Sequence, residues 1–310
     1  MRLLEVHQLK LEEFNERKRP DYAILSHTWG EGEVSLQDLS TPAATTMDGY
    51  RKIKKCRELA IQDGFKYVWI DTCCIDKTSS AELSEAINSM YNWYQSARIC
   101  YAYLSDVTIG DDPSDPESPF SNSRWFTRGW TLQELLAPNI VIFFDRDWAD
   151  IGTKSSLQED ISRITGIPRK ALSNQAIDEI SIAQRMSWDA MRRTTRVEDV
   201  AYCLMGIFGV NMPTLYGEGR QAFIRLQYEI MKSSDDHSLF AWASPNPQKS
   251  IFQPPARWTN PDDDGSESGL LASSPKQFRY AQGVRRLDEV ASSKYPFAMT
   301  NNGLHIWLPV

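Results

Sequence analysis

Two short apolar runs on either side of one helical pattern constrain the fold of this chain more than any other feature. The runs, Ile99 to Leu104 and Ile140 to Phe144, are rich in aromatic and β-branched residues, which is typical of strands buried on both faces of a parallel sheet. The helical pattern between them covers Trp130 to Ala137. Parallel strands joined through a helix need a right-handed crossover, so the loop before the helix lies at the carboxyl end of the first strand. Ligands bind at that edge in open α/β sheets.

The predicted helix has one apolar side. Leu132, Leu135 and Leu136 fall together on a 3.6-residue period, and Glu134 falls opposite them. This pattern predicts that the leucines pack on the sheet and that Glu134 points away from the core.

Two further strands precede this unit. Tyr22 to Leu25 and Tyr67 to Ile70 are short and apolar, and each is followed by a helical pattern, over Tyr50 to Gln62 and from the Ser79–Glu82 capping box onward. Alternating strands and helices predict a doubly wound parallel sheet of the α/β class. In a flavodoxin-like strand order of 2-1-3-4, the turns that follow the first and third strands face each other across one crevice.

Past residue 150 the pattern changes. Helical segments dominate residues 151–234, whereas residues 235–310 alternate short aromatic segments, such as Leu239 to Trp242 and Phe278 to Tyr280, with Pro, Ser, Asp and Gly. We therefore predict an α/β core over residues 1–150, a helical part over 151–234 and a small β-rich appendage over 235–310. The chain ends within a strand-like run, so we expect the appendage to be truncated.

Composition argues against several classes of protein. A net charge of −7 argues against a nucleic-acid binder, because release of counterions needs a basic face. The basic run Arg51 to Arg57 is interpreted as the solvated face of a helix, with a patch for an anionic ligand or a membrane as a weaker alternative. The five cysteines include no Cys-x-x-Cys spacing, which favours a reducing, cytoplasmic location over a disulfide framework or a zinc site. No apolar run reaches the roughly 18 residues of a transmembrane helix, so we expect no membrane span.

Several sequence blocks resemble the HET (heterokaryon incompatibility) domain of filamentous fungi. The blocks are YAILSHTWG, YVWIDTCCIDK, SRWFTRGWTLQELLAP and RTTRVEDVAYCLMGIFGVNMPTLYGEG, which together span Tyr22 to Gly219. The segment DDHSLFAWA, which begins at Asp235, resembles the extension that often follows HET domains. The resemblance implies a role in non-self recognition that triggers programmed cell death. It also implies fusion to, or partnership with, a nucleotide-binding or repeat module.

The order of strand, Ser-Asp turn, loop, helix and strand is also similar to part of a TIR domain, whose S-x-W-C-x-x-E-L helix carries the glutamate that cleaves NAD⁺. Ser123, Trp125, Glu134 and Leu135 match that pattern, with a longer spacing between Trp125 and Glu134. The likeness implies a TIR-like core and an NAD⁺ glycohydrolase in which Glu134 is the catalytic carboxylate. NAD⁺ or a related nucleotide is then the substrate, and neither a bound cofactor nor a metal is implied.

A single carboxylate at this edge suits the chemistry of NAD⁺ cleavage. Breaking the bond between nicotinamide and ribose passes through an oxocarbenium-like transition state, which a carboxylate stabilises by its charge. Tryptophan rings stack on nicotinamide or adenine, and backbone N–H groups of a turn bind phosphates. The candidate binding residues are Ser26, His27, Trp29, Gly30, Asp71, Cys73, Asp76, Ser105, Trp125 and Trp130.

Each assignment has a structural alternative. Glu134 is otherwise an exposed helical residue, and the tryptophans are otherwise core or loop anchors. Asp71 and Asp76 are otherwise residues that cap the following helix or hold its loop. A cysteine nucleophile, formed by the adjacent pair that begins at Cys73 together with His27, is a weaker alternative.

Two functions stay open for the protein as a whole. The first is an enzyme that hydrolyses NAD⁺ when its molecules are clustered by partner modules. The second is a non-catalytic module whose surfaces mediate self-association and recruit a downstream killer. Release of nicotinamide by purified protein distinguishes the two.

Overall fold

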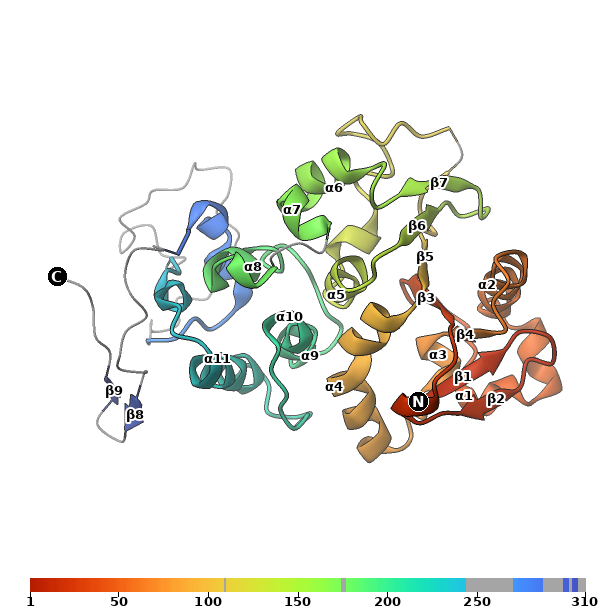
Figure 1. Cartoon of the computed structure of the whole chain (residues 1–310), viewed down its shortest axis with the longest axis horizontal. Helices are drawn as coiled ribbons and strands as arrows, with labels where there is room; N and C mark the ends of the chain where they lie inside the picture. Colours follow the sequence, from red (N-terminus) through yellow and green to blue (C-terminus); the bar gives the residue numbers. More distant parts are fainter. Residues whose placement is uncertain (109, 174–176, 244–269, 287–297, 301–302, 306–310) are drawn as a thin grey trace. The chain divides into compact units, whose positions relative to one another are not determined.

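The chain divides into two compact units, Met1–Gln175 and Ala176–Val310 (Figure 1). The computed structural model describes residues 1–108, 110–173, 177–243, 270–286, 298–300 and 303–305.

The first unit is built on a seven-stranded sheet in the order β2-β1-β4-β3-β5-β6-β7. The strands are β1 (Arg2–Glu5), β2 (Leu11–Glu13), β3 (Ala23–His27), β4 (Tyr67–Trp69), β5 (Ile99–Tyr103), β6 (Val141–Phe144) and β7 (Asp150–Thr153). The four central strands β4, β3, β5 and β6 run parallel in the predicted 2-1-3-4 order. The antiparallel strands β1, β2 and β7 extend this predicted sheet at its two edges.

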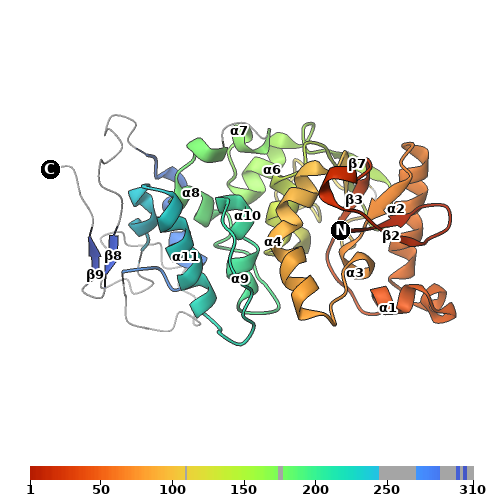
Figure 2. The ribbon, with the colours of Figure 1, turned by 60° about the horizontal axis from the view of Figure 1, so that its bottom comes forward.

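Helices cover both faces of the sheet. α2 (Tyr50–Gln62) lies on one face, whereas α4 (Ser80–Ser96) and α5 (Thr131–Leu136) lie on the other (Figures 1 and 2). Right-handed crossovers explain this, because α2 leads from β3 toward one edge and α4 and α5 lead back toward the other. The chain adds β4 on one side of β3 and then β5 and β6 on the other side. The carboxyl ends of β3 and β5 therefore form the switch point of the sheet. The shorter helices are α1 (Leu36–Leu39), α3 (Asp71–Cys74), α6 (Gln158–Thr165) and α7 (Arg169–Leu172).

Aromatic side chains pack the sheet against the face that carries α4 and α5. Trp69 of β4 meets Trp93 and Tyr94 of α4 edge to face, with ring centroids 5.6 and 5.8 Å apart. Trp125, which precedes α5, makes the same kind of contact with Phe143 of β6 at 5.5 Å. Each such pair contributes about 0.5–1.5 kcal/mol beyond the area that it buries. These contacts hold α4 and α5 in fixed positions over the sheet.

The first unit continues past residue 150, where we predicted the end of the α/β core. β7 pairs with β6, placing Thr153 opposite Ile142, and Ile161 of α6 is fully buried. The sequence pattern missed this strand because Asp-Ile-Gly-Thr carries little apolar signal. Residues 151–173 therefore complete the α/β unit instead of beginning a helical one.

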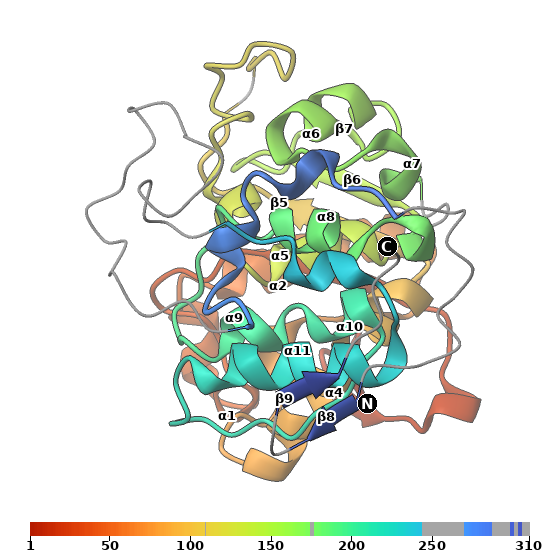
Figure 3. The ribbon, with the colours of Figure 1, turned by 90° about the vertical axis from the view of Figure 1, so that its left-hand side faces the viewer.

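The second unit is mainly helical. Its helices are α8 (Ile182–Ser187), α9 (Asp199–Tyr202), α10 (Met205–Phe208) and α11 (Gln221–Ser233). Three 3₁₀ turns pack on α8: η5 (His237–Phe240), η7 (Pro275–Phe278) and η8 (Ala281–Gly283). Figure 3 shows the blue segment that contains η7 and η8 curving round this helix. Gln227 of α11 is fully buried and pairs with the backbone N–H and C=O of Ala272 at 3.0 and 2.8 Å. No helix among the described residues is long and apolar enough to cross a membrane.

The described residues of the predicted β-rich appendage contain both 3₁₀ turns and a pair of strands. The segments Leu239 to Trp242 and Phe278 to Tyr280 lie in or beside 3₁₀ turns. Asp236 and Ser274 stabilise these turns, because their side chains accept hydrogen bonds from backbone N–H groups two residues later. The described strands of this part are β8 (Ala298–Thr300) and β9 (Gly303–His305), which pair antiparallel. Residues 244–269 and 306–310 lie outside the described part of the chain.

Candidate functional site at the carboxyl ends of the parallel strands

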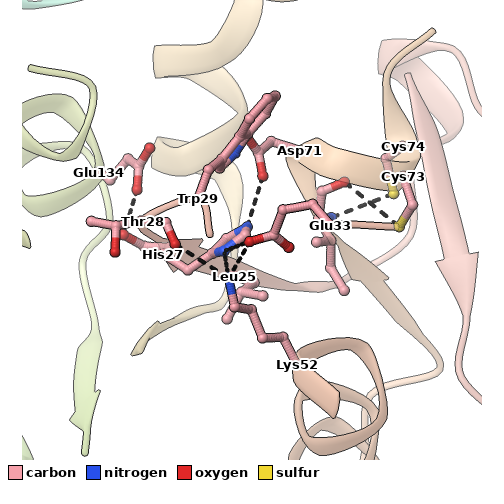
Figure 4. A network of polar contacts seen from close by, with 12 residues as sticks. Leu25, His27, Thr28, Trp29, Glu33, Lys52, Asp71, Cys73, Cys74 and Glu134 are labelled. Atoms are coloured by element: carbon pink, nitrogen blue, oxygen red, sulfur yellow. Dashed lines mark hydrogen bonds and ion pairs between the residues drawn. The ribbon is translucent and has the colours of Figure 1, made fainter. Parts of the chain in front are cut away.

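Functional side chains gather where β3 and β4 end. β3 runs through Ser26 to His27, and Asp71 begins α3 just after β4. α5, which lies between β5 and β6 in the chain, supplies Glu134. Hydrogen bonds join Ser26 to Glu134 and His27 to Asp71. Figure 4 shows His27 beside Asp71, with Glu134 nearby. These four residues therefore lie at one edge of the sheet.

Glu134 is buried, with 7% of its surface exposed, contrary to the prediction that it points away from the core. α5 has only about one and a half turns, and β3, α4 and α7 all pack against it. These contacts leave no side of the helix facing solvent. Ser26 Oγ donates a hydrogen bond to Glu134 Oε2, and Trp125 Nε1 donates to Ser26 Oγ at 2.9 Å. Ser26 and Trp125 are fully buried as well, so this chain of hydrogen bonds orients the carboxylate in a region of low dielectric.

A tyrosine lies close to the same carboxylate. The hydroxyl of Tyr94 donates to the carbonyl of Leu25 at 2.9 Å. Burial, and then the negative charge of Glu134, raise the pKa of Tyr94 well above its usual value. Tyr94 therefore stays a neutral hydroxyl beside Glu134.

The carboxyl end of α5 is capped by a buried lysine from beyond β7. Lys154 Nζ donates to the carbonyl of Leu135 at 3.2 Å and to the carbonyl of Pro138. The last carbonyls of a helix have no partner inside it, so this ammonium group completes α5. Burial lowers the pKa of Lys154 to about 8.

His27 lies between a cation and an anion. Lys52 Nζ is 3.1 Å from His27 Nδ1, and Asp71 Oδ1 is 3.0 Å from His27 Nε2. An ammonium group can only donate, so Nδ1 accepts, and Nε2 carries the hydrogen that it donates to Asp71. Both ring nitrogens are engaged. Neutral His27 therefore positions Lys52 and Asp71 and is not a free base.

Asp71 extends this network to a partly exposed tryptophan. Trp29 Nε1 donates to Asp71 Oδ2 at 2.7 Å, and Lys77 Nζ lies 3.5 Å from the centroid of the Trp29 ring. Burial acts to raise the pKa of Asp71, but the hydrogen bonds from His27 and Trp29 and the charge of Lys77 prevail and lower it to about 2. Asp71 is thus a firmly ionised carboxylate.

The loop after β3 is fixed to the start of α2. Glu33 accepts hydrogen bonds from Lys52 Nζ and, at 2.8 Å, from the N–H of Gly30. Gly49, which precedes α2, approaches this loop so closely that a Cβ would lie 2.7 Å from Glu33 Cα and 2.9 Å from the Gly32 carbonyl oxygen. Only glycine permits this approach, which brings Lys52 to the cluster.

Comparison with known proteins identifies the family. The model for the heterokaryon incompatibility protein (HET) family matches residues 22–115, and a model for a domain of unknown function, DUF8212, matches residues 221–298. Over 229 residues the chain is 51% identical to vegetative incompatibility protein HET-E-1 of Podospora anserina. The chain belongs to the HET family.

The alignment with HET-E-1 covers 72% of this chain but 17% of that relative, so the chain spans a small part of the length of the protein that it matches. No solved structure matches the chain. The residues matched by the HET model include the turn after β3, Lys52, Asp71 and Lys77. The match ends before Glu134.

Two of the predicted binding residues, Trp125 and Cys73, are buried in the core. Trp125 is fully buried against Phe143, so its ring cannot stack on a nucleotide in this structure. Cys73 is fully buried, and a hydrogen bond with Cys74, followed by burial, raises the pKa of its thiol well above the usual value. A thiol in this state opposes the alternative of a cysteine nucleophile.

The four other predicted residues are Gly30, Asp76, Ser105 and Trp130, and each has a local contact or is partly buried. Asp76 accepts hydrogen bonds from the Thr78 N–H and hydroxyl at 3.0 and 2.6 Å, so it holds its own loop. The N–H of Gly30 is bonded to Glu33, as described above, and does not face outward as a phosphate donor. Ser105 accepts from Arg124 at 3.0 Å, apart from the Ser26 and Asp71 networks. Trp130 is half-buried at the start of α5.

The sequence did not reveal Glu33, Lys52, Tyr94 or Lys77. Lys52 was assigned to a solvated helix face, but its side chain is only 14% exposed and turns toward His27. Lys77 carried a usable signal, because it follows Asp71 in the block DTCCIDK at the end of a predicted strand. The described residues contain no group of three or more His, Cys, Asp or Glu side chains that could hold a metal ion.

Proposed function

We propose that this HET domain is the death-triggering part of an incompatibility protein and that, once assembled, it hydrolyses NAD⁺ to nicotinamide and ADP-ribose. The identity of 51% to vegetative incompatibility protein HET-E-1 supports the incompatibility role. The observation that carries the reaction is the buried Glu134 carboxylate, which Ser26 holds at the carboxyl end of β3 in the sheet. The half-exposed ring of Trp29 and the ionised Asp71 follow at the same edge.

The proposed reaction breaks the bond between ribose C1′ and the nicotinamide nitrogen. Its electron pair leaves with nicotinamide, which becomes neutral, and positive charge develops on the ribose. The Glu134 carboxylate stabilises that charge, and its buried position strengthens the interaction because few water molecules screen it. Water then adds its oxygen to C1′ and loses a proton, which gives ADP-ribose.

The burial of Glu134 also suits activation by assembly. A carboxylate with 7% exposure meets a substrate only after the residues around it move. Association with other molecules supplies free energy for such a change. We therefore expect little turnover by dilute protein and a steep rise when the molecules are clustered.

The test follows nicotinamide release from NAD⁺ by chromatography, at increasing protein concentration and with the chain fused to an inducible dimeriser. Glu134→Gln keeps an oxygen that accepts from Ser26, so the protein should melt close to the native temperature. Its turnover should fall roughly a hundredfold or more, as expected when one preorganised electrostatic group is lost. The matched control is Glu117→Gln on the exposed loop after β5, which should retain the native rate.

A folded Glu134→Gln protein that cleaves NAD⁺ at the native rate would exclude Glu134 and direct attention to Asp71. The second candidate function is a non-catalytic module for self-association, and the same burial of Glu134 favours it, because Ser26 and Glu134 would then only hold α5 on β3. Absence of turnover in every assembled state would support this module.

A further inference from the structure

The ammonium group of a lysine lies over one face of an exposed tryptophan ring. Trp29 is 48% exposed, and Nζ of Lys77 lies 3.5 Å from its ring centroid. The quadrupole of an indole ring attracts a cation in this position. The indole N–H donates to Asp71 at 2.7 Å, so the ring is held at its edge. Trp29 is therefore a fixed aromatic surface with the Lys77 cation on it, and Figure 4 shows its ring beside Asp71.

The groups around Trp29 favour positive charge at this position. Asp71 is ionised and faces Trp29, and the other nearby carboxylate, Glu33, is paired with Lys52. Burial lowers the pKa of Lys77, although Asp71 acts to raise it. The ammonium of Lys77 thus loses hydration in order to lie there. A cation that is less strongly hydrated than an ammonium group would lose less.

We infer that the ring face of Trp29 is a binding site for a planar organic cation and that Lys77 occupies this face until such a ligand enters. A pyridinium ring has the charge of an ammonium group, weaker hydration and a flat surface that stacks on indole. In the proposed reaction this cation is the nicotinamide ring of NAD⁺, so the identity of the natural ligand rests on the proposed function.

The site also explains how the product would leave. Cleavage converts the cationic ring of NAD⁺ into neutral nicotinamide, which loses the attraction to the ring face and to Asp71. Lys77 then returns to Trp29. The site thus distinguishes substrate from product by charge, because the two rings have nearly the same shape.

The test compares 1-methylnicotinamide, a permanent cation, with neutral nicotinamide on the full chain. Each compound is titrated while the indole N–H signal of Trp29 is followed by NMR, and Trp29→Phe identifies that signal. The cation should bind about three- to thirtyfold more tightly than the neutral compound, the range that a cation–π contact supplies. Equal affinities would overturn the inference.

Lys77 provides a matched pair of variants. Lys77→Met keeps a long side chain without charge and should bind 1-methylnicotinamide severalfold more tightly than the native chain. Lys77→Arg keeps the competing cation and should not. Unchanged affinity in Lys77→Met would also overturn the inference, and this comparison decides the matter even if Trp29→Phe fails to fold.

Binding and turnover separate the two proposals. Selective binding of the cation without NAD⁺ cleavage would leave this inference standing and refute the proposed reaction. Cleavage of NAD⁺ without preference for the cation would do the reverse.

Discussion

A neutral histidine holds two opposite charges at fixed positions in the HET domain. His27 accepts from Lys52 and donates to Asp71, and its side chain is only 2% exposed. Of the groups in this cluster, Asp71 gives the clearest test of how its charge contributes to stability.

We predict that Asp71 stabilises the fold above about pH 4 and loses this effect as the pH falls toward 2. Its folded pKa of about 2 lies below the value of about 3.9 expected in the unfolded chain, so the unfolded chain takes up the proton first. The contribution is about 2 kcal/mol. Urea unfolding of native protein and of Asp71→Asn between pH 2 and 7 measures it.

In Asp71→Asn the loss of stability between pH 4 and 2 should be smaller by that amount. Asp147→Asn is the control, because Asp147 has a side chain that is 56% exposed. An identical acid dependence in native protein and Asp71→Asn would contradict the assignment.

At the scale of elements, the position of α2 depends on one glycine. Gly49→Ala would bring a Cβ to 2.7 Å from Glu33 Cα, and backbone atoms cannot yield as a flexible side chain can. We predict a loss of about 1–3 kcal/mol in the free energy of unfolding, as for other overpacked sites. Gly30→Ala is the matched control, because its nearest new contact would be Glu33 Oε1 at 3.8 Å. Equal stability of the two variants, measured by urea unfolding, would show that α2 can shift freely.

The central elements could be predicted from the sequence because each carries its own signal. β3, β4, β5 and β6 are short apolar runs between helical patterns. Their observed order is the flavodoxin-like order 2-1-3-4 that we considered for such a sheet. The edge strands β2 (Leu-Glu-Glu) and β7 (Asp-Ile-Gly-Thr) carry little such signal, so they were not placed in the sheet.

The site was predictable in position but not in detail. Strand order predicts that Ser26, Asp71 and Glu134 meet at one edge. Periodicity assigns Lys52 to a helix face, but it does not show that the end of β3 lies opposite that face. The burial of Glu134 likewise depends on α4 and α7, which are distant in the sequence. The TIR-like core stays a prediction.

At the scale of the whole molecule, the first unit needs the residues up to 175. A fragment of residues 1–150 lacks β7, α6 and α7, and it loses Lys154, so it exposes the edge of β6 and part of α5. We predict that this fragment aggregates, whereas a fragment of residues 1–175 is soluble and melts cooperatively. Size-exclusion chromatography and thermal melting compare them. A soluble, cooperative fragment of residues 1–150 would place the boundary where the sequence pattern first put it.

The cap on α5 has a consequence for the order in which the protein is made. Lys154 is translated after Glu134, and it reaches the carbonyls of α5 from beyond β7. A nascent chain that has not yet emerged beyond β7 therefore has the glutamate without the helix end that positions it. In the ribosome-bound chain, α5 therefore lacks this cap until the edge of the sheet has closed.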